Sequence, residues 1–154
     1  MTEITLKPIG YIHNARLGLG DDNWGNIVSE IRLDESLPEE SLDGLEIFSH
    51  AEIIFYFDQV ADEKDIPMSR HPRGNKDWPQ VGIFAQRNKD RPNHLGLTVV
   101  SILKHEGHSL FVKGLDAVDG TPVLDIKPVF AEFLPREAIR QPEWSHELMK
   151  DYWD

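Results

Sequence analysis

The sequence predicts an all-β fold, mainly antiparallel, closed into a single compact β-barrel with short helices and a C-terminal helical tail. Three observations predict it: seven short strand-like segments follow one another, helical periodicity is scarce, and 154 residues suit one domain. A barrel is favoured over a sandwich because closure removes the strand edges that glycine- and proline-bounded strands would otherwise expose. We expect a barrel domain over residues 1–135, and a tail over residues 136–154 that packs on the barrel or on a partner subunit.

The expected strands are rich in β-branched and aromatic residues, and their apolar positions tend to recur at every second residue. In chain order they are ITLKPIGYIHN (4–14), NIVSEIRLD (26–34), EIFSHAEIIFYFDQV (46–60), QVGIFAQR (80–87), LTVVSILKH (97–105), SLFVKGLD (109–116) and PVLDIKPVF (122–130). One face of the second strand carries alternate residues: Ile27, Ser29, Ile31 and Leu33.

Glycine and proline mark the turns between these strands. Glu106-Gly107-His108 separates the fifth and sixth segments and predicts a hairpin. Pro122 and Pro128 limit the last segment to a sheet edge or a short span, because proline cannot donate a ladder hydrogen bond. Residues 61–80 contain three prolines, one glycine and no periodicity, which predicts a long loop of the kind that is usually functional or mobile.

Helical signal is confined to two segments. PEESLDGL (38–45) predicts one or two turns that begin at Pro38 and end before Gly44. PEWSHELMKDYW (142–153) predicts a C-terminal helix that docks through the side carrying Trp144, Leu148 and Tyr152.

Composition excludes several classes of protein. The chain has no cysteine, which excludes a disulfide scaffold, a zinc–cysteine site and a thiol nucleophile. The opening residues, MTEITLKPIG, have neither the basic n-region nor the apolar h-region of a signal peptide. The longest strongly apolar run, IIFYF, is too short to span a bilayer. We therefore expect a soluble cytoplasmic protein with no membrane attachment.

Charge is distributed unevenly along the chain. The net charge is −11, which by itself argues against a nucleic-acid partner. The window from Lys64 to His94 reverses this, because seven basic residues against three acidic ones give it +4 and leave −15 for the remainder. Such a reversal is typical of a site for phosphate or carboxylate, and equally of a solvated basic loop.

Three aspartates interrupt the apolar stretch GLDAVDGTPVLDIKP (114–128). Asp119-Gly120 is a turn dipeptide, so an Asx-type turn explains Asp119 well and Asp116 in part. Asp125 lies within a strand among apolar neighbours and needs a partner, for which Lys127 on the same face is one candidate. Turn and ion pair are one interpretation of these residues, and a ligand site is the other.

Two further groups of residues bear on chemistry. His94, His105 and His108 have no metal-ligand spacing, and the chain lacks the glycine motifs of serine hydrolases, dinucleotide folds and P-loops, so we expect no metal. Arg87 is expected at the end of a strand, and Arg91 enters a turn stiffened by Pro92. Two rigid guanidinium groups suit recognition of a carboxylate or phosphate, although solvated arginines are the commoner case.

Four motifs, PIGYIHN, GLEIFSHAEIIFYF, VGIFAQRNKDRPNHLGLT and GLDAVDGTPVLDIKP, resemble the TrmO family, also called TsaA-like or YaeB-like. The resemblance runs from about Ile4 to Pro128. It implies an N-methyltransferase that modifies N6 of threonylcarbamoyl-adenosine beside the tRNA anticodon, with S-adenosylmethionine as donor. It also implies a β-barrel without a Rossmann fold, and a homodimer.

The resemblance further implies which residues contact the donor. By motif they are Asp58 and Gln59, Arg87, Leu97, the run Asp116, Ala117, Val118 and Asp119, and, in the loop DDNWG, Asp22, Asn23 and Trp24. A general base would help the attacking nitrogen to lose its proton. Our candidate is Asp125, with Lys127, Arg91 and Asn93 on the substrate side. The alternative function is a module that only binds S-adenosylmethionine, or a methyltransferase with a substrate other than tRNA.

Overall fold

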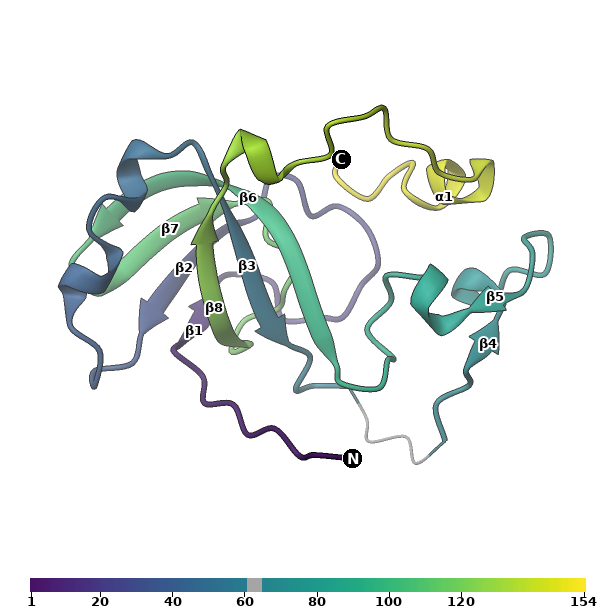
Figure 1. The fold of residues 1–154 in the computed structure, drawn as a ribbon, viewed down its shortest axis with the longest axis horizontal. Helices are drawn as coiled ribbons and strands as arrows, with labels where there is room; N and C mark the ends of the chain where they lie inside the picture. The colour runs from purple at the N-terminus through teal and green to yellow at the C-terminus, as the bar shows by residue number, and fades with distance from the viewer. Residues whose placement is uncertain (61–64) are drawn as a thin grey trace.

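The computed structural model describes residues 1–60 and 65–154, and its main body is a closed antiparallel barrel (Figure 1). The order of strands around the barrel is β1-β2-β7-β6-β3-β8. Their bounds are Gly10–His13 for β1, Val28–Leu33 for β2, His50–Tyr56 for β3, Leu95–Glu106 for β6, Ser109–Lys113 for β7 and Pro122–Pro128 for β8. The predicted fold class, an antiparallel barrel with short helices, is confirmed.

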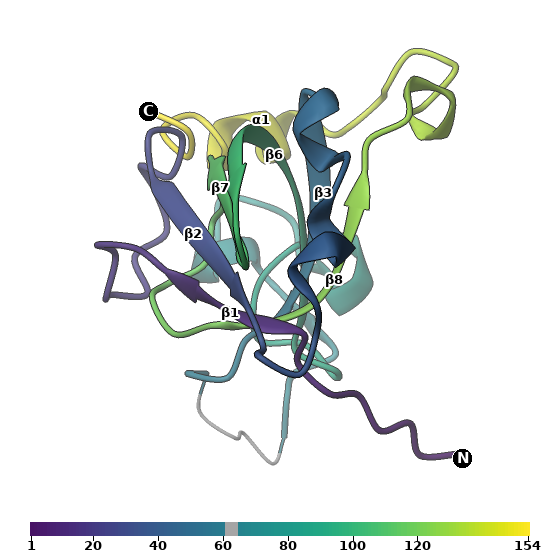
Figure 2. The same cartoon turned by 90° about the vertical axis from the view of Figure 1, so that its left-hand side faces the viewer.

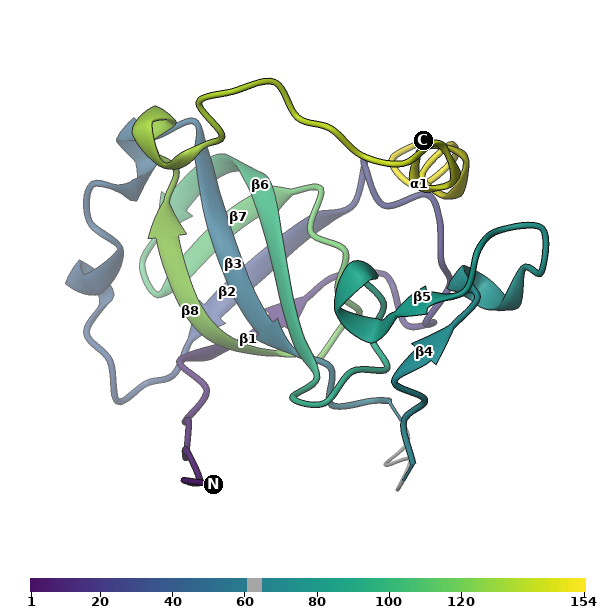
Figure 3. The same cartoon turned by 45° about the vertical axis from the view of Figure 1, so that its right-hand side comes forward.

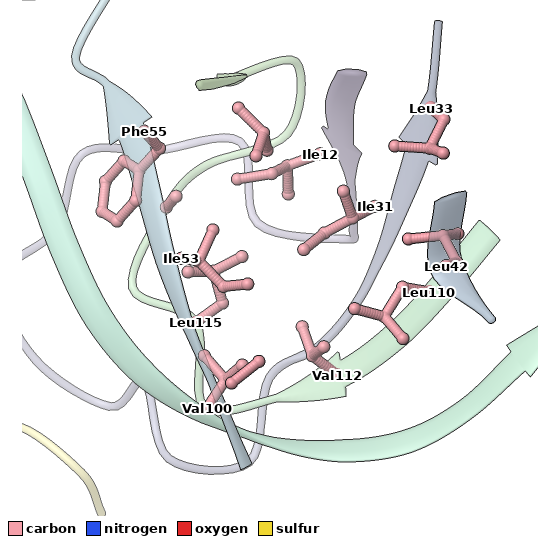
Figure 4. Close-up of a cluster of buried hydrophobic side chains, with 13 residues drawn as sticks. Ile12, Ile31, Leu33, Leu42, Ile53, Phe55, Val100, Leu110, Val112 and Leu115 are labelled. Atoms are coloured by element: carbon pink, nitrogen blue, oxygen red, sulfur yellow. The ribbon is translucent and has the colours of Figure 1, made fainter. Parts of the chain in front are cut away.

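Alternation along the strands builds the interior of the barrel. The expected inward face of β2 is confirmed for Ser29, Ile31 and Leu33, which are buried. Side chains of β1, β2, β3, β6 and β7 converge on one apolar centre, with Phe55 of β3 among the largest (Figure 4). Gly96 of β6 lies opposite Phe55 in the ladder, and a Cβ there would come within 2.4 Å of the Phe55 ring. Glycine is therefore required at that point of the β3–β6 pair.

The β6–β7 hairpin forms where it was predicted. Glu106 pairs with Ser109, and Gly107 at the tip adopts φ +56°. The turns η1 (Glu39–Leu42) and η2 (Leu45–Ile47) precede β3 and lie on the side of the barrel that faces the viewer in Figure 2. Gly44 between them is left-handed, with φ +92°, so the expected end of the first turn is confirmed.

The first and last strands are shorter than the predicted segments. The first strand is only Gly10–His13, and the exposed residues before it extend outside the barrel. Of the two alternatives for the last segment, a sheet edge or a short span, the structure has the short span: β8 runs from Pro122 to Pro128 and pairs with both β1 and β3. Its prolines occupy its first and last positions, so the interior ladder loses few donors.

The segment between β3 and β6 forms a small excursion beside the barrel. It contains β4 (Ser69–Arg70), η3 (Pro72–Gly74), β5 (Val81–Gly82) and η4 (Ile83–Ala85). The strand predicted over residues 80–87 is thus wrong beyond Gly82. The buried Gln86 explains this, because its Nε2 donates to the carbonyls of Arg70 and Val81 and fixes a bend there. The loop predicted over residues 61–80 lies partly outside the described residues.

The C-terminal segment crosses from β8 to the excursion. After η5 (Ala131–Phe133) the chain runs over the barrel to α1 (Glu143–Leu148), which lies beside the β4–β5 excursion in Figures 1 and 3. The observed helix is therefore shorter than the one predicted over residues 142–153, and Tyr152 lies beyond its end. Among residues 1–60 and 65–154 no helix has the length and apolar character that crossing a bilayer requires.

Candidate functional site

Asp119 joins the segment after β7 to the end of β1. Its Oδ1 accepts a 2.9 Å hydrogen bond from the N–H of Asn14, and its own N–H donates to the carbonyl of Arg16 over 2.7 Å. The turn expected at Asp119-Gly120 is present, but the prediction that the Asp119 side chain closes it is wrong. Thr121 closes the turn instead, since its N–H and Oγ1 both donate to the carbonyl of Val118.

Asn14 holds this junction together through its side chain. Its Nδ2 donates to the Ser29 hydroxyl and to the Ala117 carbonyl, each over 2.9 Å, and its Oδ1 accepts from the N–H of Arg16 over 2.9 Å. Ser29 is fully buried, so this amide satisfies a hydroxyl inside the barrel as well as a carbonyl of the 114–121 segment.

Asp116 accepts hydrogen bonds on both carboxylate oxygens. The Thr98 hydroxyl of β6 donates to Oδ1, and the Tyr152 hydroxyl of the C-terminal segment donates to Oδ2. Burial, and then the Asp116 carboxylate, raise the pKa of the Tyr152 hydroxyl well above its ordinary value, while Arg87 and Arg73 act in the opposite direction. The Tyr152 hydroxyl therefore keeps its proton and can continue to donate it to Asp116 in a hydrogen bond.

The loop containing Asp22, Asn23 and Trp24 folds against the same region. The Arg16 guanidinium lies 3.9 Å from the centroid of the buried Trp24 ring and donates to the carbonyls of Asp22 (2.8 Å) and Asn23 (3.1 Å). The Asp22 carboxylate pairs with Arg73 of the excursion at 3.1 Å. This loop thus links the end of β1 to the β4–β5 excursion.

Three of the remaining predicted donor contacts also reach this region. Arg87 Nη2 donates to the carbonyl of Leu97 over 2.7 Å, and the residue after Leu97 is the threonine that binds Asp116. Gln59 Nε2 donates to the carbonyl of Asp119 over 3.1 Å. Asp58, directly before Gln59, has an exposed side chain. Arg87 follows η4 and not a strand, which corrects its expected placement.

Asp125 and Lys127 of β8 take no part in the hydrogen bonds of Asp116 and Asp119 described above. Their side chains form the expected ion pair, at 3.8 Å. Asp125 also lines a cavity of about 420 Å³ between η1, η2 and β8, whose other lining residues are Ile9, Leu33, Leu37, Ser41, Leu42, Asp43, Gly44, Leu45, Phe48, Ile126 and Pro128. No residue of this cavity belongs to the hydrogen-bonded network of Asp116 and Asp119. In the ladder Asp125 pairs with Ile54 of β3, which pairs on its other side with Leu97, so one strand lies between the candidate base and that predicted donor contact.

The other two substrate-side candidates lie in the loop before β6. Arg91 Nη1 donates to the carbonyls of Gln86 (2.9 Å) and Asn88 (3.4 Å), so its guanidinium holds the loop in shape. Asn93 is exposed in the turn that the His94 N–H closes on the Arg91 carbonyl.

The basic window keeps part of its charge available. Arg70 pairs with Asp90 at 3.7 Å, and Arg73 is paired as described above. Lys76 and Arg87 are exposed in the described part of the window, whereas Lys64 lies outside the described residues.

Two of the three histidines considered as metal ligands contact backbone carbonyls. His105 Nε2 lies 2.7 Å from the carbonyl of Gly107, and His108 Nε2 lies 3.1 Å from that of Leu37. Within the ranges 1–60 and 65–154, no three His, Asp or Glu side chains gather so as to hold a metal ion.

Sequence reasoning missed Asn14, Thr98 and Tyr152. The first two lie inside motifs quoted above, Asn14 directly after β1 and Thr98 within β6. Tyr152 lies outside every motif, and only the fold brings it to Asp116 from 36 residues away.

Comparisons with known proteins agree with this architecture. The family model described as the tRNA-methyltransferase O N-terminal domain matches residues 22–133. The rat tRNA (adenine(37)-N6)-methyltransferase is 33% identical over 152 residues, which cover 94% of this chain and 35% of that protein. A probable S-adenosyl-L-methionine-binding protein of Methanothermobacter thermautotrophicus is 35% identical over 133 residues, which cover 84% of this chain and 93% of that protein.

Solved structures lead to the same family. The crystal structure of TrmO from Pseudomonas aeruginosa superposes with a TM-score of 0.75 at 29% identity, covering 94% of this chain and 62% of that one. The chain thus spans about a third of the rat relative and less than two thirds of the bacterial one. Since the family model covers most of the chain and a relative of similar length is 35% identical, the chain belongs to the family of the tRNA-methyltransferase O N-terminal domain.

Proposed function

We propose that this chain is an S-adenosylmethionine-dependent N-methyltransferase that methylates N6 of threonylcarbamoyl-adenosine next to the tRNA anticodon. One observation carries the proposal: hydrogen bonds join segments from four parts of the sequence around Asp116 and Asp119. The names of the rat and Pseudomonas relatives support the reaction and its RNA substrate.

The chemistry of the site fits the donor. S-adenosylmethionine carries a ribose diol, an ammonium group, a carboxylate and an adenine edge. The two aspartates are acceptors for the hydroxyls or the ammonium, and Arg87 is exposed and suited to the carboxylate. Ala117 and Val118 are buried, and among the described residues their N–H groups donate no hydrogen bond to the protein, which leaves them for the adenine.

The residues of the site would act by binding and alignment. When bound, S-adenosylmethionine would supply an electrophilic methyl group. Asp116 and Asp119 would hold the donor in a fixed orientation, because each carboxylate is itself fixed by hydrogen bonds from another segment. The buried Trp24 and the C-terminal segment would exclude water from this side. Alignment and exclusion of water are the main sources of acceleration for such a displacement.

The acceptor would approach from the basic excursion. Exposed Lys76 offers a phosphate contact there, on a chain whose net charge is −11. Arg91 and Asn93 remain substrate-side candidates in the adjoining loop. Asp125 and Lys127 are weaker candidates, since they pair with each other and Asp125 lines the separate cavity.

We also propose a homodimer in the cytoplasm. The outer face of β6 supports the dimer, since its side chains Leu95, Leu97, Val99 and Leu103 are between 39% and 49% exposed. Light scattering at micromolar concentration tests it, and a monomeric mass would contradict it.

Methyl transfer from labelled S-adenosylmethionine to tRNA that lacks the modification tests the function. We expect incorporation by the wild-type chain and losses of roughly tenfold to a hundredfold in Arg87→Ala and Asp119→Ala, because each removes a charged hydrogen-bonding group. Arg136→Ala, at an exposed arginine of the tail, is the matched control. Absence of transfer to tRNA from any source would refute the substrate.

A second candidate function is donor binding without turnover. It is favoured by the archaeal relative of similar length, which is named only as a probable S-adenosyl-L-methionine-binding protein. Calorimetric binding of the donor, with no transfer to any RNA or lysate fraction, would select this function.

A further inference from the structure

We propose that Tyr152, supplied by the C-terminal segment, is a positioning residue of the donor site that fixes the Asp116 carboxylate. The inference rests on the proposed function and extends it to a part of the chain that the family model, ending at residue 133, does not cover. It makes the segment after α1 part of the site.

The geometry at Asp116 is the first support. Thr98 binds one carboxylate oxygen and Tyr152 the other, so both donors act on one side chain from opposite directions in the sequence. A carboxylate fastened at both oxygens has little rotational freedom, and each oxygen still has a lone pair for a further donor. A ligand hydroxyl or ammonium would therefore meet an acceptor that is already oriented.

The attachment of the segment is the second support. The N–H of Trp24 donates to the Tyr152 carbonyl over 2.8 Å, and that of Asn23 donates to the Asp151 carbonyl over 3.2 Å. The next residue, Gly25, lies so close to the segment that a Cβ would come within 1.9 Å of the Trp153 carbonyl oxygen. The segment is thus paired, backbone to backbone, with the loop predicted to close over the donor.

A second anchor holds the other end of the segment. Trp78 Nε1 of the excursion donates to Glu147 of α1 over 2.8 Å, and the Trp78 and Trp144 rings lie 6.5 Å apart. The C-terminal segment is therefore attached at two places, and Tyr152 lies at the second of them.

Calorimetric titration with S-adenosylmethionine tests the inference in the full chain. We expect Tyr152→Phe and Thr98→Val each to weaken binding roughly threefold to tenfold, because each removes one hydrogen bond to a charged group and leaves the donor's own contacts in place. Tyr11→Phe, at an exposed tyrosine of β1, is the matched control and should bind as the wild type does. The double variant should depart from the product of the two single effects by more than twofold, since both hydroxyls act on Asp116.

Hydrogen exchange of the wild-type chain gives a readout that needs no variant. Saturating donor should slow exchange of the amides of residues 22–25 and 149–153. A purely structural role for Tyr152 would leave the two substitutions multiplicative and these amides unchanged by donor.

The outcomes separate the two proposals. Three results would each overturn the role of Tyr152 alone. The first is donor binding by Tyr152→Phe as tight as that of the wild type, and the second is a double-variant effect within twofold of the product of the two single effects. The third is amide exchange at residues 149–153 that the donor does not change. No donor binding by the wild-type chain would refute the donor site itself, and this inference with it.

Discussion

Replacing Asn14 by alanine tests whether the junction between β1, β2 and the 114–121 segment stabilises the fold. The substitution removes three side-chain hydrogen bonds, to the Ser29 hydroxyl, the Ala117 carbonyl and the Arg16 N–H. A net hydrogen bond contributes about 1 kcal/mol, and a buried group left without a partner costs about 1–3 kcal/mol. Ser29 is fully buried, so we expect Asn14→Ala to lower the free energy of unfolding by about 2–4 kcal/mol.

Urea unfolding followed by tryptophan fluorescence measures this loss, and the four tryptophans give ample signal. Asn26→Ala, at an exposed asparagine before β2, is the control and should change the free energy of unfolding by no more than about 0.5 kcal/mol. A loss below about 1 kcal/mol for Asn14→Ala would show that the junction relaxes or recruits water, and the reasoning from its hydrogen bonds would fail.

The remaining predictions concern packing and pH. Gly96→Ala forces a Cβ to within 2.4 Å of the Phe55 ring and should cost about 1–3 kcal/mol in urea unfolding, whereas Gly18→Ala meets open space; equal effects would contradict the packing argument. A hydrogen bond from a serine hydroxyl of β7, and next a neighbouring arginine, lower the pKa of Glu30 from 4.5, so its stabilisation is present above that pH and is lost as the pH falls. The stability difference between wild type and Glu30→Gln should therefore shrink between pH 6 and pH 3, and a constant difference would refute the assignment. Because folding raises the pKa of the Tyr152 hydroxyl, the folded protein should lose stability as the pH rises above 10. Tyrosine ionisation on alkaline unfolding raises the absorbance at 295 nm, and Tyr152→Phe should reduce that rise. An unchanged rise would place the Tyr152 hydroxyl in water in the folded protein.

Local pattern was enough to predict the barrel. Period-two alternation placed Ser29, Ile31 and Leu33 inward, and the Gly107 turn set the β6–β7 hairpin. The prediction failed where a tertiary partner overrides the local signal. Residues 83–87 are apolar enough for a strand, yet the strand ends at Gly82 and the buried Gln86 side chain folds back to the carbonyls of Arg70 and Val81 in the β4–β5 pair. In β8 the prolines indicated an edge or a short span; they bound a short span, and their positions at its two ends leave the central residues free to pair on both sides.

In the candidate site, too, some residues could be predicted from local sequence, whereas their partners are set by the tertiary structure. Motif residues such as Asp116 and Asp119 were predicted as donor contacts because the motif that contains them resembles the TrmO family, whereas the residues alone left a turn and a ligand site as alternatives. Their partners come from far along the chain: Asn14 is 105 residues from Asp119, and Tyr152 is 36 residues from Asp116. No local pattern marks such a partner, because the hydrogen bond exists only after the barrel closes and the C-terminal segment crosses to the excursion. Asp125 differs from these two aspartates, since its carboxylate pairs with Lys127 in its own strand and one strand, β3, lies between it and Leu97. The orientation of the two site carboxylates is thus a property of the whole barrel and of the segment packed on it, and changes at Asn14 or Tyr152 should affect donor binding more than changes at Asp125.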